Sequence, residues 1–300
     1  NILARNLVMS SRFCFAVLLP RPDSSTRYWE LPLKGVEKAR SELEKYGITV
    51  AVFLYERNNK RSFQEQAAKI MSSRIDGLLL APKFVNEVPL LLQDCNNKNI
   101  PFVFIDSSLS DRASLCNIGQ PLFESGCVAG QLFRNRFDKG TVLITYIQDE
   151  MDNEEVLTEK TRGLKQYLQE QGKGITVEKL LLKTLHAPTI KRELSKAFKQ
   201  LPGIKGIFVL NSKVAPVARF IEQERKAGIC LIGYDLLEED YPFLENGIID
   251  FLICQQPEEQ TYKGIYKMFE STLLKLQPEK QIYMPIDIVM KGNYKFYSYK

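Results

Sequence analysis

The sequence predicts an α/β protein made of two doubly wound lobes, each with a parallel sheet covered by helices on both faces. Apolar runs of strand length alternate with amphipathic helical segments, and this cycle restarts near residue 122. The chain also has 300 residues, whereas a single hydrophobic core usually stops growing at roughly 250–300 residues. Continuous apolar strands suit a parallel sheet that is buried on both faces.

The first half of the chain reads as a β-α-β-α-β-α-β series. A loop is expected at Pro20–Tyr28, and Gly47 ends the helix that follows it. Ser62 and Glu65 have the spacing of a capping box, which predicts the start of the next helix near Ser62. The strands of this half are expected at Phe13–Leu19, Ile48–Tyr55, Ile75–Pro82 and Pro101–Ile105.

The second half repeats the same alternation of helices and strands. Its helices are expected at Leu122–Phe137 and Glu159–Gln171, and from about Ile190, Lys213 and Pro257. Its strands are expected at Thr141–Ile147, Val177–Leu182, Gly206–Leu210, Cys230–Tyr234, Ile249–Cys254 and Tyr283–Met290.

Composition and motifs exclude several classes of protein. The net charge of +5 comes from interspersed charges, and no basic arm marks a nucleic-acid-binding face in the main body. The six cysteines form no CxxC motif or His/Cys cluster, so neither a metal site nor a redox pair is expected, and buried free thiols favour a cytoplasmic setting. No apolar run in the sequence reaches about 18 residues, so no membrane-spanning helix is expected.

The sequence also lacks the motifs of doubly wound enzymes. No GxGxxG follows a strand, neither a P-loop nor a GxSxG elbow occurs, and a single histidine leaves little for a catalytic triad. We therefore expect a binding protein that is not an enzyme and has no cofactor.

Polar residues directly follow four of the expected strands. Ligands of doubly wound sheets bind beyond the carboxyl ends of the strands, so these positions are candidates for ligand contact. Each residue type is also common in turns and caps, which is the alternative interpretation. The four residues are Asp106, Asn211, Asp235 and Gln255.

The order and spacing of several short motifs resemble the type I periplasmic-binding-protein fold, as used by ribose-binding proteins and by lac- and purine-repressor-type regulators. The resemblance covers nearly the whole chain. Its motifs are Tyr28-Trp29 before Leu33-Lys34-Gly35, Ile75-Asp76-Gly77-Leu78, Ile100–Asp106, Thr161-Arg162-Gly163-Leu164, Ile207–Asn211, Ile232–Asp235 and Ile253–Pro257.

The resemblance implies a sugar site with both aromatic and charged walls. Tyr28 and Trp29 match aromatic residues that stack on the apolar face of a sugar ring, although both could instead be core residues of a helix start. Asp106 and Asp235 match carboxylates that accept hydrogen bonds from hydroxyls, and Arg162 matches a donor from the second lobe. An interlobe salt bridge or a strand-end cap is the alternative for Asp235 and Arg162.

Further positions complete the implied site or depart from the family. Asn211 and Gln255 match amides that donate and accept, and His186 lies in a loop where relatives have a pocket residue, although a loop histidine is often without such a role. Sugar-binding relatives often have Arg after the first-lobe carboxylate, but here Ser107 follows Asp106. The first loop is also longer and adds Arg21, Asp23 and Arg27.

The resemblance further implies that three chain crossings form a hinge between the lobes. They are expected near Ile118-Gly119, Gln255–Pro257 and Met284-Pro285. The N-terminal lobe would then comprise residues 13–118 and 257–284, and the C-terminal lobe residues 119–256 and 285–300. A ligand that bonds to both lobes would favour the closed state.

Residues 1–12 resemble the hinge helix that joins a helix-turn-helix headpiece to the body of lac-type repressors. The matching pattern is Asn, two variable residues, Ala4-Arg5, one variable residue and Leu7. The resemblance implies that Leu7 wedges into the DNA minor groove, that Ala4 permits close approach and that Arg5 approaches phosphates. The alternative is an ordinary amphipathic start. The DNA-reading headpiece is not in this sequence and would precede it.

These expectations favour the effector domain of a LacI-family transcription regulator. A sugar bound between the lobes would change operator DNA affinity through the hinge helices by allostery, in a cytoplasmic homodimer without membrane contact. The alternative is a sugar-binding protein of a transporter, or the ligand domain of a sensor kinase.

Overall fold

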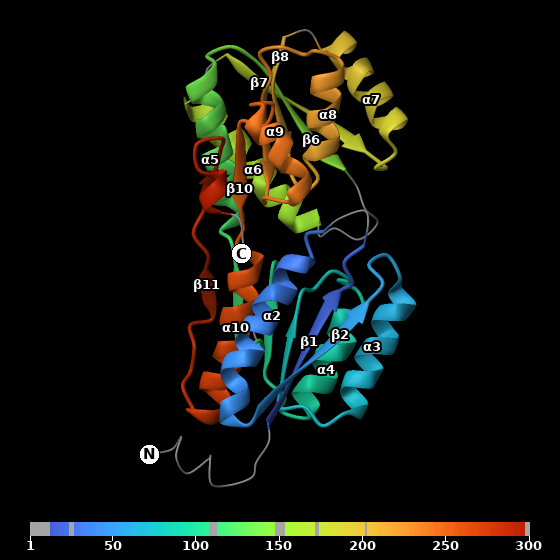
Figure 1. The fold of residues 1–300 in the computed structure, drawn as a ribbon, viewed down its shortest axis with the longest axis vertical. Helices are drawn as coiled ribbons and strands as arrows, with labels where there is room; N and C mark the ends of the chain where they lie inside the picture. The colour runs from blue at the N-terminus through green and yellow to red at the C-terminus, as the bar shows by residue number, and fades with distance from the viewer. Residues whose placement is uncertain are drawn as a thin grey trace. The chain divides into compact units, whose positions relative to one another are not determined.

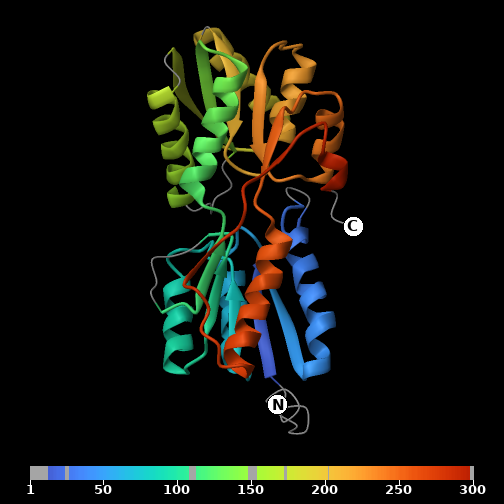
Figure 2. The same ribbon diagram turned by 90° about the vertical axis from the view of Figure 1, so that its left-hand side faces the viewer.

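The computed structural model describes residues 13–23, 27–107, 113–147, 154–171, 174–201 and 203–297. It confirms the predicted fold class, because it has two six-stranded, mostly parallel sheets with helices packed on both faces of each (Figures 1 and 2). The three residues expected to contact DNA, Ala4, Arg5 and Leu7, lie outside the described residues.

Contacts divide the chain into two compact units. The first unit lies within Asn1–Gln120 and Gln256–Met284, and the second within Pro121–Gln255 and Pro285–Lys300. The chain thus passes from one unit to the other after Gln120, Gln255 and Met284. No helix in the described parts of either unit is both long and apolar enough to cross a membrane.

The first unit has the strand order β11-β5-β4-β3-β1-β2, and every pairing in this sheet is parallel. Helices α2 and α10 cover one face, and α3 and α4 cover the other (Figure 1). The strands are β1 (Phe13–Pro20), β2 (Ile48–Tyr55), β3 (Gly77–Leu80), β4 (Phe102–Ile105), β5 (Cys116–Gly119) and β11 (Gln281–Tyr283). The helices are α2 (Glu30–Leu43), α3 (Lys60–Ser72), α4 (Val88–Asn97) and α10 (Pro257–Leu273).

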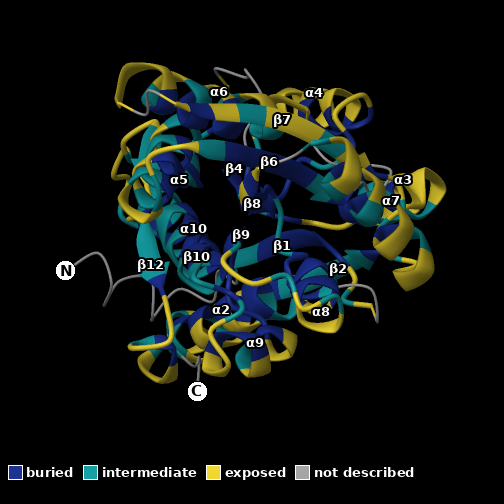
Figure 3. Ribbon diagram, turned by 90° about the horizontal axis from the view of Figure 1, so that it is seen from above, coloured by how far each residue is buried: buried dark blue, intermediate teal, exposed yellow. Residues whose placement is uncertain are grey.

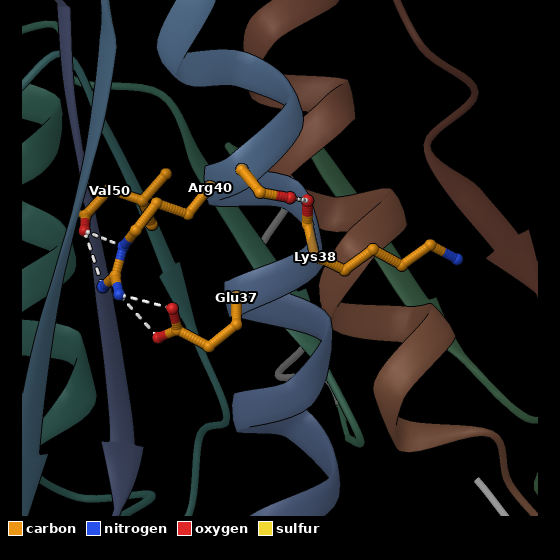
Figure 4. Close-up of polar contacts among 5 residues, drawn as sticks. Glu37, Lys38, Arg40 and Val50 are labelled. Carbon is orange, nitrogen blue, oxygen red and sulfur yellow. Dashed lines mark hydrogen bonds and ion pairs between the residues drawn. The ribbon is translucent and has the colours of Figure 1, made fainter. Parts of the chain in front are cut away.

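Helix α2 is tied to the edge strand β2 through Arg40. Its guanidinium donates to the backbone oxygen of Val50 from Nε at 3.3 Å and from Nη2 at 3.0 Å. The Nη1 atom of Arg40 donates to both carboxylate oxygens of Glu37, at 2.5 and 2.7 Å (Figure 4). The side chain thereby occupies a backbone acceptor on a strand that has a neighbour on one side only, where exposed backbone groups favour association.

The start of α3 differs from the capping box expected at Ser62. The helix begins at Lys60, and Asn59 is its N-cap because the Asn59 side chain accepts from the Ser62 backbone N–H at 3.0 Å. The Ser62 hydroxyl instead accepts from the Glu56 backbone N–H at 3.0 Å. Asparagine caps as well as serine does, so the prediction identified the helix and was wrong about its capping residue.

The second unit has the strand order β12-β10-β9-β8-β6-β7, in which β10 and β12 are antiparallel. The strands are β6 (Gly140–Ile147), β7 (Ile175–Leu182), β8 (Ile204–Val209), β9 (Cys230–Tyr234), β10 (Phe251–Cys254) and β12 (Asp287–Val289). The helices are α5 (Leu122–Arg136), α6 (Glu154–Gln171), α7 (Ala187–Gln200), α8 (Ala215–Gln223) and α9 (Tyr241–Glu245).

Alternate residues of the central strands in this unit enter two different core layers. Ile207 and Leu231 pack with residues of α7, α8 and α9. Their neighbours Phe208 and Ile232 pack with residues of α5 and α6. Most residues of the central strands are therefore buried, as the dark blue of most of β8 shows in Figure 3, whereas the edge strand β7 carries several exposed residues.

The last expected strand, Tyr283–Met290, is in fact two strands. β11 pairs with β5 in the first sheet, and β12 pairs with β10 in the second. Pro285 lies between them and has no backbone N–H to give to a ladder. The apolar pattern continues through this break, so periodicity alone predicted a single strand.

Helices α5 and α6 lie side by side at a distance that only glycine permits (Figure 1). A Cβ atom at Gly126 of α5 would come within 2.1 Å of the backbone oxygen of Lys160 on α6. In the first unit α10 is equally close to its sheet, because a Cβ atom at Gly264 would come within 2.4 Å of Leu79 Cδ1. The first contact is with rigid backbone, and the second is with the end of a side chain that can rotate.

These two contacts predict unequal effects of adding one methyl group. We expect Gly126→Ala to lower the free energy of unfolding of the second unit by about 2–3 kcal/mol, because α5 and α6 must separate. We expect Gly264→Ala to cost about 1 kcal/mol or less in the first unit, since Leu79 can move and alanine favours the helix. Urea unfolding measures both, and Gly292→Ala is the control because that site is open. Equal costs at Gly126 and Gly264 would contradict the prediction.

Candidate functional site

In the first unit, groups from three other elements converge on Asp106. This residue directly follows β4 and has a φ of 67°, in the left-handed region. The Tyr28 hydroxyl donates to Asp106 Oδ1 at 2.5 Å, and Lys83 Nζ lies 2.7 Å from Oδ2. The Asp106 backbone N–H donates to Gln260 Oε1 of α10 at 2.8 Å. The carboxylate is therefore held in one orientation at the carboxyl end of its sheet.

Tyr28 and Trp29 lie beside this carboxylate at the start of α2. Their ring centroids are 5.1 Å apart in an edge-to-face arrangement, and both residues are buried. Lys83 Nζ lies 5.5 Å from the centroid of the Trp29 ring, so the same ammonium group contacts the aromatic wall and the carboxylate. The structure thus brings together the three site residues that the sequence predicted for this lobe, and it adds Lys83.

The residues of the longer first loop form ion pairs with neighbouring segments. Asp23 Oδ2 lies 3.3 Å from Arg57 Nε, and Arg21 Nε lies 3.0 Å from Glu56 Oε1. Arg27 pairs with Glu30 at 3.0 Å. The loop after β1 is therefore joined to the segment after β2 by two ion pairs.

Two hydroxyl groups near Asp106 are buried and have no hydrogen-bond partner among the described residues. One is the Tyr55 hydroxyl at the end of β2, and the other is Ser107 Oγ. Burial raises the pKa of Tyr55, and the negative charge of Asp106 raises it further. Tyr55 is therefore a neutral phenol close to Asp106, and sequence reasoning missed it because it reads as the last apolar residue of a strand.

In the second unit, Asp235 and Gln255 form one hydrogen-bonded pair. Asp235 directly follows β9, has a φ of 58° and is 1% exposed. Gln255 donates its backbone N–H to Asp235 Oδ1 at 3.0 Å and its side-chain Nε2 to Oδ2 at 2.8 Å. Two residues predicted independently at the ends of β9 and β10 therefore lie in direct contact.

Lys160 extends this pair and is a buried cation that sequence reasoning missed. It is 2% exposed, and its Nζ donates to Gln255 Oε1 and to the Leu210 backbone oxygen, both at 3.3 Å. The same atom lies 3.4 Å from the centroid of the Tyr234 ring. A signal was present in the sequence, because Lys160 precedes the buried residues Leu164 and Leu168 by four and eight positions and so shares their helix face.

Arg162, in contrast, lies on the outer side of α6. Its side chain is 56% exposed, forms an ion pair with Glu159 at 2.6 Å and lies 4.2 Å from the centroid of the Phe123 ring. The hydrogen bond with Glu159 raises the pKa of Arg162. Two positions along a helix are about 200° apart, so Lys160 and Arg162 face different surroundings, and no contact joins Arg162 to Asp235 in the described structure.

The remaining two predicted residues have different surroundings. Asn211 follows Leu210, donates Nδ2 to the Ile147 backbone oxygen at 3.0 Å, and has a buried Oδ1 without a partner among the described residues. His186 is exposed at the N-cap of α7, where its Nδ1 lies 3.2 Å from Thr189 Oγ1. Asn211 is therefore adjacent to the Lys160 contact, whereas His186 is not joined to this group.

The described residues contain no group of three or more His, Cys, Asp or Glu side chains placed to hold a metal ion. All six cysteines are free thiols, and burial raises the pKa of Cys95, Cys116 and Cys230 to about 12. The site groups of both units are thus hydrogen-bonding carboxylates, amides, ammonium groups and aromatic rings.

Asp240 is a buried carboxyl close to Asp235. It is 1% exposed and accepts the Leu237 backbone N–H at 3.0 Å. Burial raises the pKa of Asp240 well above its usual value, the Leu237 hydrogen bond opposes this, and the charges of Glu239 and Asp235 raise it further. Because the native state binds this proton more tightly than the unfolded chain, stability falls as pH rises from about 4 toward the raised native pKa.

Asp240→Asn should remove this pH dependence, because asparagine keeps the acceptor oxygen and carries no charge. We expect the Tm of the variant to match that of the parent near pH 4 and to exceed it at pH 7, at roughly 2–4 °C for each kcal/mol gained. Thermal unfolding followed by circular dichroism from pH 4 to pH 8 measures the difference. The exposed neighbour gives the control Glu239→Gln, and a Tm difference that does not grow with pH would rule out the buried carboxylate as its cause.

Comparisons with known proteins agree with this fold. A family model described as periplasmic binding protein domain matches residues 15–271. A candidate LacI transcriptional regulator from Bacteroides fragilis is 27% identical, with a TM-score of 0.82, over 96% of this chain and 100% of that one. A glucose-galactose binding protein from Geobacillus stearothermophilus is 22% identical, with a TM-score of 0.80, over 94% and 99% of the two chains.

A solute binding protein from Burkholderia graminis, solved in complex with D-arabinose, is 18% identical, with a TM-score of 0.81, over 96% of this chain and 98% of that one. No curated protein matches the sequence. The family match spans well over half of the 300 residues, and the two doubly wound units are the architecture that the resemblance implied. The chain therefore belongs to the periplasmic binding protein domain family.

Proposed function

We propose that the chain is the effector-sensing domain of a LacI-family transcription regulator, which binds a sugar or sugar-like molecule between its two lobes. The observation that carries this proposal is the end-to-end similarity to the candidate LacI regulator, at 27% identity. A glucose-galactose binding protein and several ABC transporter proteins match over 94–96% of this chain at 15–22% identity. The resemblance of Asn1–Leu7 to a hinge helix supports the same choice.

The chemistry of the strand ends supports a polyhydroxylated ligand. Carboxylates such as Asp106 and Asp235 accept hydrogen bonds from hydroxyls, and the ammonium groups of Lys83 and Lys160 donate to them. Trp29 supplies an aromatic surface for the apolar face of a sugar ring. Several similar proteins were solved with D-arabinose, D-allose or D-tagatopyranose bound.

We assign the ligand contacts of the first lobe to Tyr28, Trp29 and Asp106. In the second lobe we propose Asn211, Asp235 and Gln255, and we give Lys160 the donor role that the sequence suggested for Arg162. Lys160 is in contact with Gln255, whereas Arg162 is half-exposed and paired with Glu159. The exposed position of His186 gives it a weaker claim to ligand contact.

In this proposal ligand binding is converted into a change of DNA affinity without any chemical turnover. Bonds to both lobes stabilise the closed state, and in a homodimer closure alters the spacing of the hinge helices that Ala4, Arg5 and Leu7 belong to. A ligand can shift this equilibrium only by its difference in affinity for the two states. The proposed setting is the cytoplasm.

The second candidate is a sugar-binding protein of a transporter, or a sensor-kinase ligand domain, and the similarity to such binding proteins favours it. The full-length gene product distinguishes the two. An upstream helix-turn-helix, homodimers in sedimentation and sugar-dependent binding to operator DNA support the regulator. A signal peptide and no DNA binding would instead support the transport protein.

Sugar binding predicts a rise in Tm and identifies the donor on α6. Ligand at 100 times its Kd should raise the free energy of unfolding by about 2.7 kcal/mol, which a thermal-shift assay detects as a higher Tm. The sugars to screen are D-arabinose, D-allose, D-galactose, D-glucose and D-tagatose. We expect Lys160→Met to weaken the best-binding sugar by about 10- to 100-fold, the value of one charged hydrogen bond.

Arg162→Met is the matched control, because it removes a cation from the same helix and introduces the same replacement residue. It should leave affinity within about threefold of the parent, as expected for an exposed ion pair. Loss of binding in Arg162→Met with full binding in Lys160→Met would reverse the assignment. An unchanged Tm with every sugar would count against the proposed function itself.

A further inference from the structure

We propose that Lys83 determines ligand specificity in the first unit, by pairing with Asp106 to select ligands that present two neighbouring hydroxyl groups beside an apolar face. This inference rests on the proposed sugar-binding function and deepens it. Position 83 follows β3 and belongs to none of the motifs that the sequence comparison with the family singled out.

The first step is the fixed position of Lys83. β3 ends at Leu80, and the Lys83 backbone N–H donates to the Ala81 oxygen at 2.9 Å across Pro82, which closes a tight turn. Ala81 is buried, and the Lys83 side chain is only 18% exposed. A lysine that follows such a turn and is mostly buried has lost much of its conformational freedom, so its ammonium group has a defined position.

The second step concerns the ion pair between the Lys83 ammonium group and Asp106. Lys83 Nζ is 2.7 Å from Asp106 Oδ2, while the Tyr28 hydroxyl donates to Oδ1 and Gln260 holds the Asp106 backbone. Lys83 and Asp106 thus form a donor and an acceptor at a fixed separation. A hydroxyl both donates and accepts hydrogen bonds, so of two adjacent hydroxyls one can donate a hydrogen bond to Asp106 while the other accepts one from Lys83.

The third step is the aromatic ring beside this pair. Lys83 Nζ lies 5.5 Å from the Trp29 ring centroid, within the range of a cation–π contact. A polar pair directly next to an indole ring matches a molecule with hydroxyls on its edge and C–H groups on its face. A ligand that lacks one of the two hydroxyls would lose its hydrogen bond to the ammonium or to the carboxylate, so the pair favours ligands that carry both.

The position after Asp106 is occupied by a residue that cannot supply this charge. Ser107 is buried, and its Oγ has no partner among the described residues. The cation at this strand end therefore comes from the segment after β3, next to β4 in the sheet. Lys83 consequently links two neighbouring strand ends through one ion pair.

The experiment compares Lys83→Met and Lys83→Arg with Lys69→Met, a control on the exposed surface of α3 in the same unit. Calorimetry measures the affinities for D-arabinose, D-allose, D-galactose, D-glucose and D-tagatose, and for the singly deoxygenated forms of the best-binding sugar. We expect Lys83→Met to weaken the best sugar by about 10- to 100-fold. The preference of Lys83→Met for the intact sugar over one of its deoxygenated forms should largely disappear. Lys83→Arg should keep part of the affinity and part of the preference, and Lys69→Met should change neither quantity.

A purely structural role of Lys83 gives a different result. If the lysine only neutralises Asp106, Lys83→Met should weaken all sugars and their deoxygenated forms by a similar factor and keep the parental ranking, and the double variant Lys83→Met, Asp106→Asn should regain the parental Tm. That outcome would overturn the inference. Parental affinity and ranking in Lys83→Met alone would also overturn it and leave the proposed function intact, because the parent still binds sugar. If the parent binds none of the sugars, both proposals fall together.

Discussion

The candidate site depends on two aspartates that leave their strands in the left-handed backbone region. Asp106 and Asp235 have φ values of 67° and 58° at the ends of β4 and β9. Such a conformation costs a residue other than glycine on the order of 1–3 kcal/mol unless its surroundings hold it. Gln260 binds the backbone of Asp106, and the Asp235 backbone N–H donates to Ile253 at 3.1 Å. The turns thus fix where each carboxylate points, and the other polar groups assemble around them.

Close helix packing places the groups that complete each half of the site. Gly264 lets α10 approach β3 and β4, and Gln260 is one helical turn before it. Gly126 lets α5 touch the α6 backbone at Lys160 itself, which fixes the start of the buried lysine side chain. Small residues in the helices are therefore as important for the polar site as the polar residues are, because they set the distance at which the side chains arrive.

The sequence predicted the sheets well because buried parallel strands form nearly continuous apolar runs, and that signal is local. β9 was predicted with its observed bounds, Cys230–Tyr234, and Asp235 with Gln255 followed from the rule that ligands meet strand ends. Lys83 and Lys160 were not singled out because a lysine is normally exposed. The spacing of Lys160 to Leu164 and Leu168 was a signal of its burial, whereas only tertiary contacts show that Lys83 is covered. The motif match selected Arg162, which lies two positions from Lys160 on a more exposed side of α6, and a short motif alone does not indicate which helix face is buried.

Each unit contains a strand-end carboxylate, a lysine and an aromatic ring close together, and these groups come from different elements in the two units. In the first, a strand-end carboxylate, a lysine from the segment after β3 and the Trp29 ring meet. In the second, the Asp235–Gln255 pair, a lysine from α6 and the Tyr234 ring meet. A carboxylate can only accept and an ammonium can only donate, so each trio offers both functions beside an aromatic face. A buried charge is tolerable only when it is paired or hydrogen-bonded, and here each lysine is held by the acceptor next to it. Donor and acceptor are thus already paired without a ligand, and in the proposed function sugar hydroxyls would exchange hydrogen bonds with them without creating a new buried charge.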